Sequence, residues 1–294
     1  MTPVEVDRYV RQMPAMEGWF WPAAAYLIAW LDQRQRLAGV TGDIFEIGAY
    51  HGRSAALLAS LLREGEQFGV CDLFGLEARA DERPTRVNYA DAPTSSGAAR
   101  GFFPAFLDNM QRFAPSGIGE RIRILRGSSA ALTPDDTGTR CRLVHIDGGH
   151  EAADVYADLA VADRALIDDG VVVLDDFHNF AWPGVAEGFF KFMQERPGRF
   201  APLAIGFNKG LVCRPAAHAA WNARFIDEAN PWSYLPRGPF SLKTVAFHGF
   251  ETFVFHAPAR RSPDVQRTLL TTLHQHKPRL ADRLANMLNY HAMP

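Results

Sequence analysis

The sequence of 294 residues is 47% hydrophobic and 22% charged, with a formal net charge of −2 and a pI near 6.6. This composition is typical of a globular protein with a substantial core, and it lacks the basic excess of nucleic-acid-binding proteins. No run approaches the roughly 20 apolar residues of a membrane-spanning helix, and we recognise no signal peptide. The sequence therefore predicts a cytoplasmic protein without nucleic acid or membrane among its partners.

Residues 1–40 are expected to be helical. Apolar residues recur at roughly helical spacing from Trp19 to Leu37, and Gly39 then ends the helix. The segment is rich in aromatic residues, which favour interfaces. Three interpretations stay open: a helix packed on the domain, a cover over the substrate site, or the surface of a homodimer.

A strand, a glycine turn and a helix come next. A strand over Asp43–Tyr50 leads into the motif EIGAYHG, and a helix over Ser54–Leu62 follows. The motif contains Glu46, Gly48 and Gly52. Gly48 permits a tight turn and close approach to the backbone. The spacing differs from the G-x-G-x-x-G of dinucleotide binders and from phosphate-binding loops, so the pattern indicates a cofactor-binding opening of another kind.

Two further strand ends carry polar residues that suit a nucleoside. The strand Phe68–Asp72 ends in an acid that can accept hydrogen bonds from ribose hydroxyls or cap a helix. The alternating strand Arg121–Leu125 is followed by Ser128, which could meet an adenine or serve as a plain turn residue. Residues 77–100 are polar and loop-like, which is compatible with a lid and equally with disorder.

The stretch from Leu143 to Asn179 contains two short apolar runs that each end in acid. Between the runs, apolar residues recur at helical spacing. Strand, helix and strand in about 35 residues form a βαβ unit, whose strands are parallel. Ligands bind beyond the carboxyl ends of such strands. The polar residues expected together there are Asp147, His150, Asp175 and Asp176.

The rest of the chain completes the sheet and adds an appendage. A helix is expected over Val185–Met193, and a hairpin over Phe200–Phe207 and Leu211–Arg214 brings the count to seven strands. Beyond it we expect a helix, a second hairpin and two final helices, over Ala216–Ala229, Leu242–Phe247 with Thr252–Phe255, Val265–His276 and Leu280–Tyr290.

The fold class is therefore α/β: a doubly wound, mostly parallel, seven-stranded Rossmann-like sheet with an antiparallel last strand and helical additions at both ends. We divide the chain into an N-terminal helical cap or oligomerisation segment at 1–40, a cofactor-binding domain at 41–214 and a C-terminal appendage at 215–294.

Four motifs mark the strand ends: EIGAYHG at the first strand, VCD at the second, HIDGGH at the fourth and LDDFHN at the fifth. Together they resemble the class I S-adenosylmethionine-dependent methyltransferases, over about residues 40–214. More narrowly, IDGGHEAADVYADLAVADRALIDDGVVVLDDFHNFAWPGV is similar to the macrocin-type and related antibiotic-sugar O-methyltransferases of secondary metabolism.

The resemblance implies where the cofactor S-adenosylmethionine lies. Its methionine part would run along Glu46 and Gly48, its ribose would contact Asp72, and its adenine would lie near Ser128. The remaining expected cofactor residues are Tyr50, Gly52, Ser54 and Asp147.

The resemblance also implies that Asp147, Asp175 and Asp176 hold a divalent metal and that His150 is the general base, with Asp147 as a second catalytic residue. The chemistry agrees. A sugar hydroxyl has a very high pKa, so a lone histidine is a poor match for it. A metal bound to the oxygen lowers that pKa, and three carboxylates suit Mg²⁺.

Simpler roles stay open for these residues. Asp147 or Asp175 could cap a helix, and Asp175 with Asp176 could contact the cofactor or a turn. His150 could bind backbone at a helix start. His145 lies inside a strand, where it is either a satisfied core group or crowds the site.

The expected function is metal-assisted O-methylation of a hydroxyl on a small molecule or saccharide. The first alternative is metal-independent transfer to a phenol or other acidic group, with His150 alone as base. A second is a cofactor-binding scaffold without turnover. A nicotinamide-dependent oxidoreductase is disfavoured by the missing G-x-G-x-x-G.

Overall fold

The structure is a computed structural model that describes residues 1–76, 83–87, 89, 101–226 and 241–256. The two final helices expected over Val265–His276 and Leu280–Tyr290 lie outside these residues, as does most of the polar segment 77–100. Among the described helices, none combines the length and the apolarity needed to cross a membrane.

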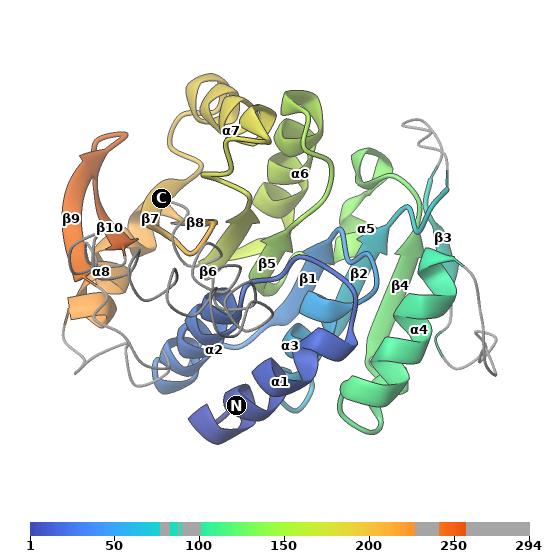
Figure 1. The fold of residues 1–294 in the computed structure, drawn as a ribbon. Helices are drawn as coiled ribbons and strands as arrows, with labels where there is room; N and C mark the ends of the chain where they lie inside the picture. The colour runs from blue at the N-terminus through green and yellow to red at the C-terminus, as the bar shows by residue number, and fades with distance from the viewer. Residues whose placement is uncertain (77–82, 88, 90–100, 227–240, 257–294) are drawn as a thin grey trace, which may run out of the picture.

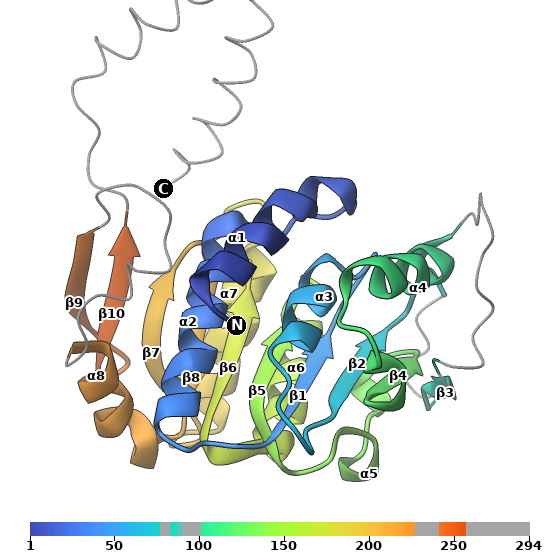
Figure 2. The same cartoon turned by 90° about the horizontal axis from the view of Figure 1, so that it is seen from below.

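One ten-stranded sheet forms the centre of the molecule, in the order β3-β4-β2-β1-β5-β6-β8-β7-β10-β9. Figures 1 and 2 show β3 and β9 at its opposite edges. The strands are β1 (Asp43–Ile47), β2 (Phe68–Asp72), β3 (Thr85–Val87), β4 (Ile122–Arg126), β5 (Cys141–Ile146), β6 (Leu166–Asp175), β7 (Ala201–Gly206), β8 (Lys209–Cys213), β9 (Ser241–Phe247) and β10 (Phe250–His256).

The predicted fold class is confirmed. β4, β2, β1, β5 and β6 are parallel neighbours, and β8 runs antiparallel between β6 and β7. The sheet is larger than the expected seven strands because β3, β9 and β10 extend its edges. The hairpin expected in the C-terminal appendage is β9 and β10, and β10 pairs in parallel with β7. The division of the chain at residues 40 and 214 stays a prediction.

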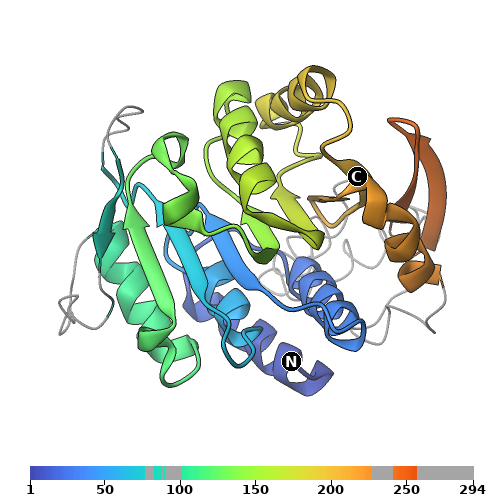
Figure 3. The same ribbon diagram turned by 180° about the vertical axis from the view of Figure 1, so that it is seen from behind.

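Helices cover both faces of the sheet, as Figure 1 shows, with α1 to α4 on one side and α6 and α7 on the other. Figure 3 shows α8, in orange, at the end of the molecule that carries β9. Successive residues of each strand face opposite layers; Leu143 packs with the first layer and Val144 with the second. The helices are α1 (Pro3–Gln12), α2 (Pro22–Leu37), α3 (Arg53–Ser60), α4 (Phe102–Phe113), α5 (Pro134–Thr137), α6 (Ala152–Ala165), α7 (Pro183–Glu195) and α8 (His218–Ile226).

A buried arginine joins α2 to the sheet. Arg142 is fully buried and is the extra residue where the pairing of β1 with β5 shifts register. Its guanidinium donates to both oxygens of Glu66 at 2.9 and 3.0 Å and to Gln35 Oε1 at 2.8 Å. It also pairs with Asp32 at 3.0 Å. Since Asp32 and Gln35 belong to α2 and Glu66 precedes β2, one planar fork holds three segments together.

Replacing this arginine should destabilise the fold strongly. Arg142→Ala leaves Glu66 buried without its main partner, which costs about 3–5 kcal/mol when a buried pair is broken on one side. The matched control is Arg140→Ala, whose exposed side chain lies 3.4 Å from Asp43 and should contribute less than about 1 kcal/mol. Urea unfolding measures the free energy of unfolding of both variants. An equal decrease in the two variants would contradict the structural role of Arg142.

Candidate active site

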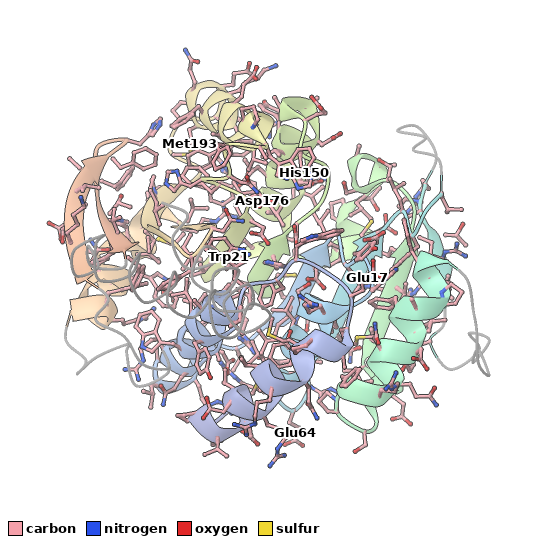
Figure 4. The ribbon with its side chains drawn as sticks, in the orientation of Figure 1. Glu17, Trp21, Glu64, His150, Asp176 and Met193 are labelled. Atoms are coloured by element: carbon pink, nitrogen blue, oxygen red, sulfur yellow. The ribbon has the colours of Figure 1, made fainter. Side chains whose placement is uncertain are left out.

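The predicted site residues lie along one edge of the sheet. Neighbouring parallel strands end at the same edge, where open α/β sheets bind their ligands. The residues at or just after these strand ends are Asp72 (β2), Ser128 (β4), Asp147 (β5), Asp175 and Asp176 (β6). Figure 4 shows His150 and Asp176 close together there.

Gly48 shapes the loop after β1. Its φ is 81°, and a Cβ at this position would lie 1.9 Å from the carbonyl oxygen of Asp147. The loop and the end of β5 are held in this close approach by a hydrogen bond of 2.7 Å from the Asp147 N–H to the Ile47 carbonyl. Gly52, with φ 83°, is the N-cap residue that precedes α3. Both predicted glycines therefore stand where the backbone requires them.

Asp72 holds this loop with its carboxylate. Oδ2 accepts the N–H groups of Ala49 at 2.5 Å and Tyr50 at 2.8 Å, and Oδ1 accepts that of Phe74 at 2.5 Å. Each carboxylate oxygen has two lone pairs, so Oδ1 keeps one position for a further donor. Asp72 and Ser128 are both partly exposed.

Glu46 lies beneath the loop, fully buried, with Oε1 2.9 Å from Nδ1 of the equally buried His145. The nearly buried Ser54 hydrogen-bonds to the same carboxyl. Burial raises the pKa of Glu46 to about 8 and lowers the pKa of His145 to about 3. At neutral pH both groups are therefore mostly uncharged, and a hydrogen bond joins them. Of the two interpretations of His145, the structure supports a paired core group.

The segment between α1 and α2 covers this pair. The ring of Phe20 is 3% exposed and meets His145 edge-on, with 5.9 Å between centroids. Glu17, labelled in Figure 4, accepts the Tyr50 hydroxyl at 2.9 Å, and Trp19 lies 5.4 Å from the Tyr50 ring. α2 itself is largely buried in the core. The N-terminal region thus contains a helix packed on the domain, and the segment before it contacts the loop after β1; the cover over the substrate site stays a prediction.

His150 and Asp176 form a dyad. Nε2 of His150 lies 2.9 Å from Oδ2 of Asp176, and the imidazole stacks on Trp182 at 4.4 Å with 16° between the planes. Although burial alone would raise the pKa of Asp176, hydrogen bonds from His150, Asn179 and Asn208 lower it to about 2. The ionised carboxylate can only accept, so Nε2 carries the hydrogen and a neutral ring has its lone pair on Nδ1.

Lys209 is the functional residue that the sequence reasoning missed. It opens β8 directly opposite Asp175, and its ammonium forms a buried ion pair with that carboxylate. Its Nζ also lies 4.9 Å from the centroid of the Phe20 ring. Phe207 and Asn208, with φ of 54° and 66°, form the tight turn that places it. The sequence contained one indication of this role: Lys209 directly follows the two-residue turn of the predicted hairpin. The strand that it begins pairs with β6, which ends in Asp175.

Potential metal ligands form two overlapping groups, each with its ligand atoms within 4.8 Å: His145, Asp147 and Asp175, and Asp147, His150 and Asp176. The predicted set of Asp147, Asp175 and Asp176 takes members from both. Burial and the neighbouring Asp175 raise the pKa of Asp147 well above its usual value. Because Lys209 neutralises Asp175 and three side chains already bond to Asp176, the predicted set lacks three open carboxylates.

Residues 45–177 match the family model of a methyltransferase domain. This part of the chain is a methyltransferase domain. The match begins in β1 and ends just after Asp176, so it contains every predicted site residue. The prediction of an S-adenosylmethionine-dependent methyltransferase is thereby confirmed.

Solved structures show only distant similarity. Calicheamicin methyltransferase CalS11 is 19% identical over 72% of this chain and 93% of its own, with a TM-score of 0.46. The O-methyltransferase NovP is 16% identical over 66% and 80%, with a TM-score of 0.45. Methyltransferase PaMTH1 of Podospora anserina, solved with S-adenosylhomocysteine (SAH), is 14% identical over 71% and 87%, with a TM-score of 0.46. No curated protein matches the chain. Similarity at these values assigns neither an acceptor nor a metal.

Gly48→Ala should disrupt the loop. The new methyl group would overlap the carbonyl oxygen of Asp147, which belongs to the backbone and cannot rotate away. We therefore expect the free energy of unfolding to fall by about 3 kcal/mol or more and SAH binding to be lost. Gly65→Ala is the matched control, because Gly65 has a similar φ of 75° but no atom within 4 Å of the added Cβ. It should cost only about 1–2 kcal/mol. Thermal unfolding and calorimetry compare the two, and a similar response would argue against the close approach.

Stability should depend on pH through Glu46. Its pKa is about 8 in the folded protein and near 4.5 when unfolded, so the folded state retains a proton that the unfolded state loses. Stability is thus present at low pH and lost as pH rises through 8. His145 acts in the opposite sense only below about pH 6.5, where the unfolded imidazole is charged. Between pH 6.5 and 8, Glu46→Gln should therefore remove a fall in unfolding free energy of about 2 kcal/mol. The unfolding free energy of both proteins is measured by urea unfolding at several pH values. The same fall between pH 6.5 and 8 in both proteins would contradict this assignment.

Proposed function

We propose that this protein is an S-adenosylmethionine-dependent O-methyltransferase that acts on a hydroxyl group of a small molecule or saccharide from secondary metabolism. The observation that carries the proposal is the His150–Asp176 dyad at the sheet edge of a methyltransferase domain. It supplies a base with a defined tautomer where the acceptor would lie.

The residues at the edge fit the cofactor. The free lone pair of Asp72 suits a ribose hydroxyl, and Ser128 at the next strand end suits adenine. The positive φ of Gly48 and Gly52 sets the course of the loop between them, along which the cofactor would lie. S-adenosylmethionine, when bound, supplies a methyl group on a sulfonium. Glu46, mostly protonated at neutral pH, would lie near the sulfonium without adding a charge.

His150 would act on the acceptor. Nδ1 would take the proton of the acceptor hydroxyl, and the ionised Asp176 would stabilise the imidazolium that forms. The stack on Trp182 fixes the plane of the ring, so that the base keeps its direction. The chain's own contribution is thus alignment and removal of one proton.

The expected Mg²⁺ does not fit the predicted ligand set as it stands. Asp175 is already neutralised by Lys209, and Asp176 already accepts hydrogen bonds from His150, Asn179 and Asn208. We therefore route no step through a metal ion. The pairing of Asp175 and Asp176 with protein groups favours a second candidate function. This function is metal-independent methyl transfer to a phenolic or similarly acidic hydroxyl, whose proton an imidazole can remove.

His150→Gln tests the base. Loss of a positioned general base lowers the turnover number by about 10²–10⁴, while SAH affinity should stay within about a factor of three because the side chain lies outside the proposed cofactor contacts. His248→Gln, at the exposed turn between β9 and β10, is the control and should keep full activity. SAH formation over a panel of phenols and saccharides gives the rates.

Calorimetry accompanies these assays. Binding of SAH but not of NAD supports the cofactor and disfavours an oxidoreductase. Cofactor binding without turnover on any acceptor would instead leave the scaffold alternative. A His150→Gln enzyme with more than about a tenth of normal turnover would refute the assigned base.

A further inference from the structure

We propose that the ammonium group of Lys209 is the resident cation of this carboxylate site, so that methyl transfer proceeds without a divalent ion at Asp175. This inference deepens the proposed function and rests on it. It concerns a residue outside the matched methyltransferase domain, on the hairpin of β7 and β8.

The ion pair is built into the fold. Lys209 is 0% exposed and Asp175 is 4% exposed. The two residues are cross-strand partners in the antiparallel pairing of β6 and β8, so the sheet register itself brings their side chains together. Asp175 is held from two more sides: its Oδ1 accepts the Asp176 N–H at 2.7 Å and lies 3.4 Å from the Asn208 amide.

The ammonium is central to the whole cluster. Besides pairing with Asp175, its charge opposes the rise in pKa that burial favours at three carboxyl groups and adds to the fall in pKa that burial causes at one imidazole. These are Glu46, His145, Asp147 and Asp176. The five groups come from β1, from β5 and the loop after it, and from the end of β6, which Lys209 meets from β8. A single positive charge that acts on all of them occupies the electrostatic position that a metal ion would take.

Lys209 cannot readily yield this position to an ion. Its Nζ lies 4.9 Å from the Phe20 ring centroid, in the range of a cation–π contact, and Phe20 closes the site from the N-terminal side. A divalent ion on Asp175 would stand beside a buried like charge, where repulsion is poorly screened. The two cations therefore exclude each other at this carboxylate.

The choice of cation bears on the acceptor. An ammonium offers hydrogen bonds and a fixed charge, but it has no open coordination positions for a substrate oxygen. It therefore acidifies a bound hydroxyl less than a coordinated metal does. Among the acceptors of the proposed function, Lys209 thus selects phenolic or similarly acidic hydroxyls over sugar alcohols.

Mn²⁺ binding to the full chain tests the exchange of cations. Free Mn²⁺ is counted by electron paramagnetic resonance in titrations of wild type, Asp175→Asn, Lys209→Met and the double variant. We expect wild type to bind no more Mn²⁺ than Asp175→Asn does. Lys209→Met, which keeps the length of the side chain but not its charge, should bind Mn²⁺ at least about tenfold more tightly than wild type. The double variant should lose this gain. Lys191→Met, at an exposed position on α7, controls for loss of a lysine.

Two results would overturn the inference: Mn²⁺ binding to wild type that Asp175→Asn abolishes, or a folded Lys209→Met protein that gains no binding. If Lys209→Met fails to fold, Lys209→Gln replaces it, and the comparison of wild type with Asp175→Asn still decides. Turnover of wild type should also survive chelation, and its loss would overturn the inference as well. Failure of the proposed function would look different: no acceptor would give SAH, whatever the result of the Mn²⁺ titrations.

Discussion

The ion pair between Lys209 and Asp175 is the interaction on which the site depends. Glu46, His145, Asp147 and Asp175 gather under Phe20 at one sheet edge, where uncompensated charge is costly. Uncompensated charge is avoided in a different way in the deepest, the middle and the outermost part of the cluster. The deepest pair is uncharged, the middle pair is an internal salt bridge, and Asp176 at the rim stays ionised against hydrogen-bond donors.

The hairpin of β7 and β8 is therefore part of the site, although the methyltransferase match ends at residue 177. Asn208 donates to Asp176 and lies beside Asp175, and Lys209 neutralises Asp175. One tight turn thus fixes the carboxylate that orients His150. The scaffold of β1 to β6 aligns the strand ends, and the hairpin determines which of the acids there stay available.

The sequence was sufficient to predict the order of the strands β1, β2 and β4 to β8 and the acids at the strand ends, because these follow from hydrophobic periodicity and the geometry of βαβ units. It could not reveal the partner of each acid. Lys209 faces Asp175, and His145 faces Glu46, only through the register of strands far apart in the chain. Likewise, the hairpin of β9 and β10 was recognisable, but its pairing with β7 was not.

In the proposed reaction, the order of the strands also separates the cofactor contacts from the base. Asp72 and Ser128 lie at the ends of β2 and β4, whereas the His150–Asp176 dyad lies beyond β5 and β6. Phe20 closes the centre, while His150 and Trp182 keep side-chain surface exposed to about a third and a half. A nucleoside bound at the first pair and an acceptor bound at the second would approach each other along the sheet edge. They would meet near Asp147, which follows β5 between the two, and such an approach from opposite sides is the alignment that methyl transfer requires.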